Sequence, residues 1–256
     1  MTWALDLDGV VWLAGTGIPG SAQAVTELRQ AGERVIFLTN NSGPLVAEHM
    51  RALAGVGIEC AATDLATSAQ AAASMLPEGS RAAFVGGEGI REALVARGVV
   101  VVGAREQPDA VVVGRTVDLD YATLGAAATA VREGARFVAT NTDATFPTGG
   151  STDGLVPGAG AIVAFVATAS GCRPEVAGKP HETLAALVRA RYGPLNVVAG
   201  DRPDTDGLFA RLVGAQFGLV LSGVTSCSDL PVDPVPAFVA DDLLSLVRGQ
   251  LGLDAC

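Results

Sequence analysis

The sequence predicts an α/β fold in which a smaller α/β unit is inserted into a parallel-sheet core. Short apolar runs alternate with amphipathic segments along the chain, which is typical of βαβ units. This pattern restarts after Pro77 and continues to about residue 175, a block long enough to form a unit of its own. From Lys179 the core pattern resumes. We therefore predict a core of residues 1–79 and 176–256 and an inserted unit of residues 80–175.

The first part of the core is expected to alternate strands and helices. The helix after the first strand has Ser21 as its expected N-cap and Gly32 at its C-terminal end. Pro44 follows the second strand and suits the first turn of another helix. The other expected elements of this part are strands at 3–8 and 34–42 and helices at 21–32 and 67–76.

The inserted unit and the second part of the core continue the alternation. In the insert we expect strands at 82–86, 99–102, 109–114 and 136–140, and helices at 88–98, 121–134 and 161–171. In the second part of the core we expect helices at 179–192, 205–214 and 241–250, and strands at 196–201 and 217–223.

Composition excludes several classes of partner. The chain is globular in composition, with 49% hydrophobic residues, and its formal net charge is −10. No run of Lys or Arg is present that could displace counterions, so we expect no nucleic-acid partner and no anionic membrane surface. The four cysteines, at 60, 172, 227 and 256, have no C-x-x-C spacing and only two histidines accompany them, so no familiar zinc site can be assembled.

The sequence predicts no signal peptide and no membrane-spanning segment. The amino-terminal residues MTWALDLDG lack the basic and long apolar regions of a signal peptide. The longest uncharged window, 154–172, is interrupted by Pro157 and glycines, so its compact apolar part is too short to span a bilayer. We therefore expect a cytoplasmic protein with free thiols.

Polar residues follow several of the predicted core strands. Ligands bind at the carboxyl ends of strands in open parallel sheets, so these residues mark a site. Asp6 and Asp8 lie so close in sequence that their carboxylates would repel without a shared proton or a cation. A hard divalent cation held by oxygen ligands satisfies them, with Asp201 as a further ligand, and Mg²⁺ is the expected ion. The strand-end residues are Asp6, Asp8, Thr39, Asn40, Asn41 and Asp201.

Lys179 is the only lysine among 17 basic residues, and every other cation of the chain is an arginine. A compact and rotatable ammonium suits one oxygen of a phosphoryl group and can balance a pocket rich in acids. We therefore place Lys179 in the same site.

Four ordered segments resemble one family. The segments DLDGV (6–10), LTNNS (38–42), GKP (178–180) and GDRPDTD (200–206) are similar in order and spacing to the motifs of the haloacid dehalogenase (HAD) superfamily of phosphatases. The insertion between the second and third segments resembles that of the NagD and p-nitrophenylphosphatase-like subgroup. The resemblance covers nearly the whole chain and implies a Rossmann-like HAD core with a C2-type α/β cap.

The resemblance also implies a role for each matching residue. Asp6 would attack phosphorus and form an aspartyl-phosphate, and Asp8 would protonate the leaving oxygen and then activate water. Thr39 and the backbone amide of Asn40 would hold phosphoryl oxygens, and Lys179 would stabilise the intermediate. The family pattern further implies that Mg²⁺ is held by the Asp6 carboxylate, the Asp8 carbonyl and Asp201, with Asp206 as a supporting acid.

Carbon–halogen cleaving relatives lack an acid two residues after the nucleophile, so Asp8 indicates a phosphatase. The last motif departs from the subgroup at Pro203 and Gly207, which puts its local geometry in question. In the cap segment ATNTDATFP (139–147), Asn141 and Asp143 are expected to face the substrate. The glycine-rich run 149–161 is either a ligand-binding loop or a connector.

Several functions remain open at this level. A phosphotransferase would use the same nucleophile, and a phospho-acceptor or phosphate-binding module would share the acids but needs no leaving-group acid such as Asp8. The resemblance leaves glycerol phosphate, phosphoglycolate, nucleotides and sugar phosphates as substrates. Relatives are often dimers through the cap, so a homodimer is one expected arrangement.

Overall fold

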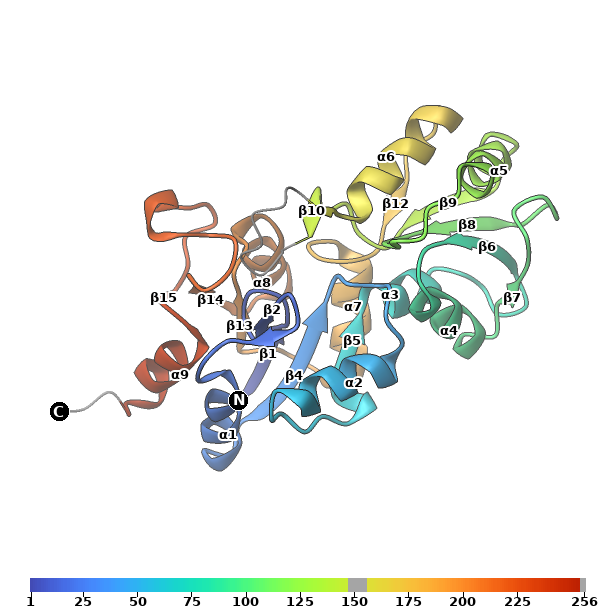
Figure 1. Ribbon diagram of the computed structural model, residues 1–256. Helices are drawn as coiled ribbons and strands as arrows, with labels where there is room; N and C mark the ends of the chain where they lie inside the picture. The colour runs from blue at the N-terminus through green and yellow to red at the C-terminus, as the bar shows by residue number, and fades with distance from the viewer. Residues whose placement is uncertain (147–155, 254–256) are drawn as a thin grey trace.

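The computed structural model describes residues 1–146 and 156–253, which fold around two parallel β-sheets (Figure 1). The larger sheet has six strands in the order β15-β14-β13-β1-β4-β5. Its strands are β1 (Thr2–Asp6), β4 (Arg34–Thr39), β5 (Leu65–Thr67), β13 (Val197–Gly200), β14 (Gln216–Val220) and β15 (Phe238–Ala240). The helices of the core are α1 (Ser21–Gln30), α2 (Val46–Gly55), α3 (Ser68–Ser74), α7 (Glu182–Tyr192), α8 (Leu208–Val213) and α9 (Leu243–Leu251).

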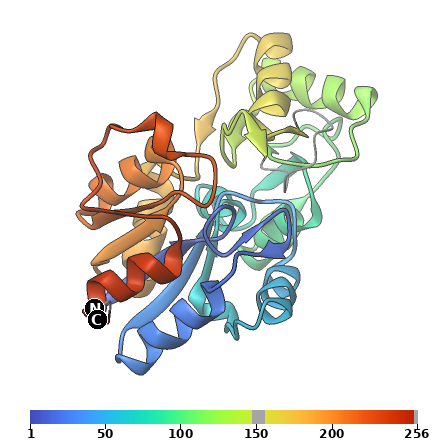
Figure 2. The ribbon, with the colours of Figure 1, turned by 60° about the vertical axis from the view of Figure 1, so that its left-hand side comes forward.

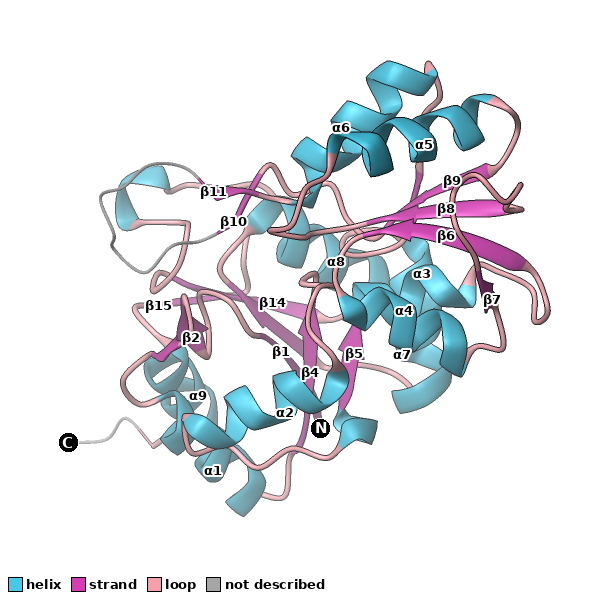
Figure 3. Cartoon of the chain, turned by 45° about the vertical axis from the view of Figure 1, so that its right-hand side comes forward, coloured by secondary structure: helices cyan, strands magenta, loops and turns pink. Residues whose placement is uncertain are grey.

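The smaller sheet has five strands in the order β12-β9-β8-β6-β7. Its strands are β6 (Arg81–Val85), β7 (Val100–Val101), β8 (Ala110–Val113), β9 (Arg136–Ala139) and β12 (Glu175–Val176), and its helices are α4 (Glu88–Ala96), α5 (Tyr121–Arg132) and α6 (Ala159–Ser170). Helices α5 and α6 lie together on one side of this sheet, and α4 lies on the other (Figure 3). Two short antiparallel pairs complete the structure, β2 (Trp12–Leu13) with β3 (Thr16–Gly17) and β10 (Thr145–Phe146) with β11 (Val156–Pro157).

The predicted α/β fold, with a parallel-sheet core and an inserted smaller α/β unit, is confirmed. The smaller sheet with its helices, called the cap below, lies to one side of the larger sheet in both ribbon views (Figure 2). The boundaries predicted at residues 79/80 and 175/176 stay a prediction, and the short strand β12 spans the second of them.

The order of the larger sheet reverses at its centre. From β1 the chain builds outward through β4 and β5, and after the cap it returns to the opposite side of β1 with β13. Leu5 therefore pairs with Phe37 on one side and with Ala199 on the other. Such a reversal separates the helical connections at the carboxyl ends of the two central strands, which leaves space for a ligand there.

Alternating residues of the strands divide the apolar core. Trp3 and Leu5 of β1 face α1 and α9, whereas Ala4 faces a second cluster with α3 and α7. This second cluster continues to Val112, on the face of the cap sheet that α4 covers. Val111, on the opposite face, belongs to a separate cluster with α5 and α6. The cap thus shares part of its buried apolar surface with the core, since the side chains of a strand alternate between its faces.

Hydrogen bonds also join the cap to the loop after β4. The hydroxyl groups of Ser42 and Thr140 lie 2.9 Å apart, and the backbone N–H of Gly89 donates to the carbonyl oxygen of Gly43 at 2.9 Å. The backbone N–H of Val46 donates to the carboxylate of Glu92. These contacts hold the carboxyl ends of the cap strands against the carboxyl end of β4.

Some sequence-based expectations were wrong in detail. Gly20, not Ser21, is the N-cap of α1; its φ of 86° is a left-handed conformation that glycine adopts readily, and Ser21 is buried in the first turn. Helix α2 begins at Val46 with Leu45 as its N-cap, so Pro44 precedes the helix. The first strand ends at Asp6, which leaves Asp8 in the turn that follows.

Two further expectations concern cysteines and membranes. Cys60, Cys172 and Cys227 are free thiols, as expected, and Cys256 lies outside the described residues. Among residues 1–146 and 156–253, no helix has the length and apolar character needed to cross a bilayer.

Candidate active site

One cavity collects the polar residues that follow the core strands. It lies at the carboxyl ends of β1, β4 and β13, where the strand order reverses, and the cap closes its other side. Every residue predicted to be catalytic, phosphate-binding or metal-binding lines it: Asp6, Asp8, Thr39, Asn40, Asn41, Asn141, Asp143, Lys179 and Asp201. Segments far apart in the sequence therefore meet at one place, as expected from the edge of a parallel sheet.

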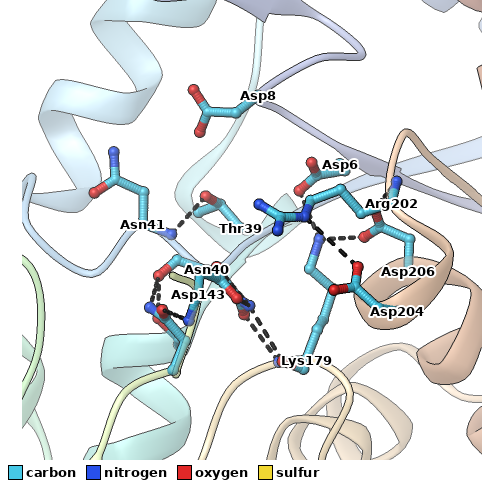
Figure 4. A network of polar contacts seen from close by, with 12 residues as sticks. Asp6, Asp8, Thr39, Asn40, Asn41, Asp143, Lys179, Arg202, Asp204 and Asp206 are labelled. Carbon is cyan, nitrogen blue, oxygen red and sulfur yellow. Dashed lines mark hydrogen bonds and ion pairs between the residues drawn. The ribbon is translucent and has the colours of Figure 1, made fainter. Parts of the chain in front are cut away.

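Lys179 connects two acids at the floor of this cavity. Its Nζ lies 2.6 Å from Asp6 Oδ1 and 2.6 Å from Asp206 Oδ1, and only 4% of the residue is exposed (Figure 4). Burial alone would lower the pKa of Lys179, but the carboxylates of Asp206 and Asp6 outweigh it and raise this pKa above its ordinary value. The ammonium therefore stays charged and holds Asp6 in place.

The acids around Lys179 fit a divalent cation. Asp6, Asp201 and Asp206 each offer a carboxylate oxygen, and these oxygens lie within 4.8 Å of one another. Asp201 Oδ2 accepts a hydrogen bond from the backbone N–H of Val224 at 2.6 Å, but its buried Oδ1 has no hydrogen-bond partner among the described residues. A buried carboxylate oxygen without a donor is costly, and a metal ion that prefers oxygen ligands would satisfy it.

Electrostatics support the same interpretation. Burial and the nearby Asp206 carboxylate raise the pKa of Asp201 to about 7. Burial also raises the pKa of Asp6 well above its ordinary value, although Lys179 opposes that shift. Burial is the largest cause of both shifts, neighbouring carboxylates add to them and Lys179 opposes them. A bound cation would stabilise the charged form of both acids.

Asp206 contributes to the site through protein contacts. Its Oδ1 bonds Lys179, and its Oδ2 accepts the backbone N–H of Arg202 at 3.1 Å. Both oxygens thus already have partners, in agreement with the supporting role implied by the family resemblance. This role stays a prediction.

The departure at Gly207 has a packing reason. A side chain at this position would overlap Phe217 and Pro234, which lie against the turn Pro203–Gly207. The turn leads into α8 and still places Asp206 on Lys179, so the altered flanking residues do not disturb the acids.

Gly9 allows the first motif to turn next to Asp201. Its φ is +86°, and a Cβ atom here would overlap the Asp201 carboxylate. The glycine thus lets the backbone of the first motif approach the acid that follows β13.

Asp8 lies apart from the group formed by Asp6, Lys179 and Asp206 (Figure 4). The indole Nε1–H of Trp12 donates to Asp8 Oδ1 at 3.0 Å. Burial raises the pKa of Asp8, and the hydrogen bond from Trp12 opposes the shift. A carboxyl group with a raised pKa can carry a proton nearer to neutral pH, as a general acid requires. The sequence alone did not predict this contact of Trp12.

Hydrogen bonds to both the core and the cap fix the loop after β4. Asn40 Oδ1 accepts the backbone N–H of Lys179 at 2.9 Å, and Asn40 Nδ2 donates to the Lys179 carbonyl and to the carboxylate of Asp143. Asn141 Nδ2 donates to the Asn40 carbonyl at 2.6 Å, and Thr39 Oγ1 accepts the backbone N–H of Asn41. Asn141 and Asp143 line the cavity but also tie the cap to this loop, a function that their turn-like sequence did not indicate.

Arg115, Phe146 and Arg202 also line the cavity, and sequence analysis assigned them no role. Arg202 lies within the fourth motif, where its charge could have drawn attention. Arg115 directly follows an apolar strand of the cap, the same signal that marked the core residues. In the glycine-rich run, residues 149–155 lie outside the described residues, whereas Gly158 and Ala159, at the start of α6, line the cavity.

The fold agrees with comparisons to known proteins. Residues 3–100 match a family described as haloacid dehalogenase-like hydrolase, and residues 176–246 match a HAD-hydrolase-like family. The chain is 38% identical over 252 residues to D-glycerol 3-phosphate phosphatase of Mycobacterium tuberculosis, covering 94% of this chain and 69% of the relative. It is 32% identical to phosphoglycolate phosphatase 2 of Arabidopsis thaliana, covering 90% of this chain and 85% of that protein.

Solved structures are similar over nearly the whole chain. The crystal structure of glycerol phosphate phosphatase from M. tuberculosis in complex with magnesium superimposes with a TM-score of 0.87 at 36% identity, covering 96% of this chain and 75% of that one. p-Nitrophenyl phosphatase from Archaeoglobus fulgidus superimposes with a TM-score of 0.88 at 28% identity, covering 97% and 98%. The chain therefore belongs to the haloacid dehalogenase-like hydrolases, among the phosphatases of the NagD and p-nitrophenylphosphatase type.

Proposed function

We propose that this protein is a Mg²⁺-dependent phosphomonoester hydrolase that acts on a small soluble phosphorylated metabolite through an aspartyl-phosphate. The observation that carries the proposal is the contact of Lys179 with Asp6 and Asp206 beside the unpartnered Asp201 oxygen. A nucleophile, a cation for phosphoryl oxygens and a set of metal ligands are thereby gathered in one cavity. The similarity to enzymes named for two- and three-carbon phosphate esters supports a small substrate.

In the first step a carboxylate oxygen of Asp6 attacks phosphorus. A new bond forms between this oxygen and phosphorus, the bond from phosphorus to the leaving oxygen breaks, and Asp8 donates its proton to that oxygen. The alcohol leaves and Asp6 carries the phosphoryl group. Lys179, Thr39 and the Asn40 amide hold the phosphoryl oxygens, and Trp12 orients the Asp8 carboxyl group.

In the second step Asp8, now a carboxylate, takes a proton from water. The water oxygen attacks phosphorus, the bond to Asp6 breaks, and inorganic phosphate leaves. The Asp6 carboxylate, the Asp8 carbonyl and Asp201 would hold Mg²⁺, with Asp206 supporting Lys179. When bound, this ion neutralises the acids and polarises the phosphoryl group. The cap limits access of water from the other side.

Phosphate release from a panel of phosphomonoesters tests this function. The panel contains D-glycerol 3-phosphate, 2-phosphoglycolate, a sugar phosphate and a nucleoside monophosphate, each with and without Mg²⁺. We expect Mg²⁺-dependent release that falls at least about a thousandfold in Asp6→Asn, because the nucleophile is lost. Asp118→Asn, which changes an exposed cap acid, serves as the matched control and should keep full activity.

Two results would contradict the proposal. One is a folded protein that binds Mg²⁺ but releases no phosphate from any ester, which would favour a phosphate-binding or phospho-acceptor module. The other is full activity in Asp6→Asn. Loss of ester without release of inorganic phosphate, with the phosphoryl group found on an added alcohol, would indicate a phosphotransferase. The cytoplasmic location and the homodimer through the cap stay predictions.

A further inference from the structure

The cap wall of the cavity holds Arg115, a cation that forms no ion pair within the described residues. Arg115 follows β8, and its guanidinium carbon lies 3.9 Å from the centroid of the Phe146 ring. Its Nε is buried and has no hydrogen-bond partner among the described residues, and no ion pair within this part of the chain includes Arg115. Stacking on an aromatic ring orders a planar guanidinium while leaving its edge free for an anion.

Arg115 is near the place where the leaving group must lie. Arg115, Phe146 and Asp8 line the same cavity, and Asp8 is the proposed donor of a proton to the leaving oxygen. Burial lowers the pKa of Arg115, and the Asp8 carboxylate is the one acid that opposes this shift. The atoms attached to the leaving oxygen therefore lie beside Arg115, whereas Lys179 is on the side of the phosphoryl group.

The other two cations among the described residues that line the cavity, Lys179 and Arg202, form ion pairs with acids. Arg202 Nε also lacks a hydrogen bond among the described residues, but it forms an ion pair with Asp204 Oδ1 at 3.6 Å, and the charges of Asp143, Asp201 and Asp206 also act on it. Asp143 accepts hydrogen bonds from Asn40 at 3.1 and 3.3 Å. Among the described residues that line the cavity, Arg115 is thus the cation without an ion pair, and its charge can match a group on the substrate.

We propose that Arg115, supported by Phe146, forms a subsite for a carboxylate on the leaving group, so that phosphorylated short hydroxy acids are preferred over neutral esters of equal length. A carboxylate matches the guanidinium edge with two parallel hydrogen bonds, whereas a hydroxymethyl group offers one. A site built around such a group discriminates against analogues that lack it, because its buried polar atoms then stay unpaired. The inference rests on the proposed phosphatase function and narrows its substrate class.

A matched pair of substrates tests the subsite. 2-Phosphoglycolate and 2-hydroxyethyl phosphate have the same length and differ in the carboxylate. We expect wild-type protein to prefer 2-phosphoglycolate by at least about tenfold in kcat/KM. Arg115→Gln should lose about tenfold or more with 2-phosphoglycolate, chiefly through KM, and less than about threefold with 2-hydroxyethyl phosphate. Arg115→Lys, which keeps the charge without the planar fork, should be intermediate.

Arg105→Gln is the control, since Arg105 is an exposed arginine of the cap outside the cavity; it should leave both rates unchanged. An equal loss for both substrates in Arg115→Gln would overturn the inference, because it would place Arg115 on the phosphoryl group or in a structural role. Absence of a preference in wild type would overturn it as well.

Direct binding separates this inference from the proposed function. Calorimetric titration of Asp6→Asn, with Mg²⁺ present, measures affinity for the two esters without turnover, and the variant Asp6→Asn/Arg115→Gln measures the contribution of Arg115. About tenfold weaker binding of 2-phosphoglycolate to the double variant, with 2-hydroxyethyl phosphate unaffected, supports the subsite even if the wild type hydrolyses neither ester. Equal affinities of both esters for Asp6→Asn would overturn the subsite even if hydrolysis occurs.

Discussion

The two walls of the active-site cavity differ in how their charges are paired. On the core wall Lys179 lies between Asp6 and Asp206 at 2.6 Å from each, so its charge is compensated within the protein. On the cap wall Arg115 stacks on Phe146 and forms no ion pair among the described residues. The core wall is therefore organised before substrate arrives, whereas the cap wall leaves a charge for the substrate to match.

Removal of Lys179 should have the largest effect. In Lys179→Met the two buried carboxylates lose their shared cation, so we expect phosphate release to fall at least about a thousandfold. Breaking a buried ion pair costs about 3–5 kcal/mol, so the free energy of unfolding should also decrease. Phosphate assays and urea unfolding measure the two effects. Lys179→Arg should be about as inactive as Lys179→Met, because the larger planar guanidinium does not fit between Asp6 and Asp206. Substantial activity of Lys179→Arg would contradict the need for a compact ammonium.

Loss of the Asp201 carboxylate should mainly weaken the binding of Mg²⁺. Asp201→Asn replaces the acid whose Oδ1 lacks a partner, and we expect Mg²⁺ to bind about a hundredfold more weakly in a calorimetric titration. Asp204→Asn is the matched control, because its side chain is 72% exposed in the neighbouring turn. Equal Mg²⁺ affinity in the two variants would contradict the assignment of Asp201.

The raised pKa of Asp201 predicts a pH dependence of metal binding. With a pKa of about 7, Asp201 holds a proton at lower pH that Mg²⁺ must displace. Mg²⁺ affinity should therefore fall about twenty-fivefold between pH 7.5 and pH 5.5 in wild type and much less in Asp201→Asn. Titrations at the two pH values measure this change.

The same group affects stability without metal, with the opposite sign. Because its folded-state pKa lies above the ordinary value, Asp201 stabilises the fold while protonated. This contribution is complete below about pH 4 and is lost as the pH rises to about 7. We expect the Asp201 contribution, measured as the difference in unfolding free energy between wild type and Asp201→Asn without Mg²⁺, to decline over this range. A difference independent of pH would contradict the shift.

The smallest effect is expected for Trp12→Phe, which removes the hydrogen bond to Asp8 and keeps an aromatic ring in the core. Glycerol 3-phosphate has a poor leaving group that needs a proton, whereas p-nitrophenolate leaves without one. We therefore expect about a tenfold loss of kcat with glycerol 3-phosphate and a smaller loss with p-nitrophenyl phosphate. Equal losses would show that Trp12 acts through packing alone.

The core wall could be predicted from the sequence because its residues directly follow apolar strands. Asp6, Thr39 and Asp201 occupy strand ends that a parallel sheet brings to one edge, and the single lysine stands out among arginines. The contact of Arg115 with Phe146 could not be predicted, since 31 positions separate two residues that meet only through the cap fold.

Short strands were also difficult to predict. Strands β5, β12 and β15 have three residues or fewer and no alternating pattern, so their pairing with neighbours decides their conformation. The N-cap at Gly20 was missed because no polar side chain caps this helix start. The N-cap at Leu45 was missed because its polar partner lies three residues later, where the Glu48 carboxylate accepts the Leu45 backbone N–H at 2.9 Å.

The most direct test of the account is to look for the phosphoryl group on Asp6. Asp8→Asn is mixed with p-nitrophenyl phosphate and Mg²⁺, quenched in acid, and digested for mass spectrometry. This ester needs no proton for its leaving group, whereas hydrolysis of the intermediate needs Asp8 as a base, so the intermediate should accumulate. We predict a burst of p-nitrophenol close to one equivalent and a phosphoryl group on the peptide that contains Asp6. Turnover without any phosphorylated peptide, or a phosphoryl group on another residue, would contradict the central claim.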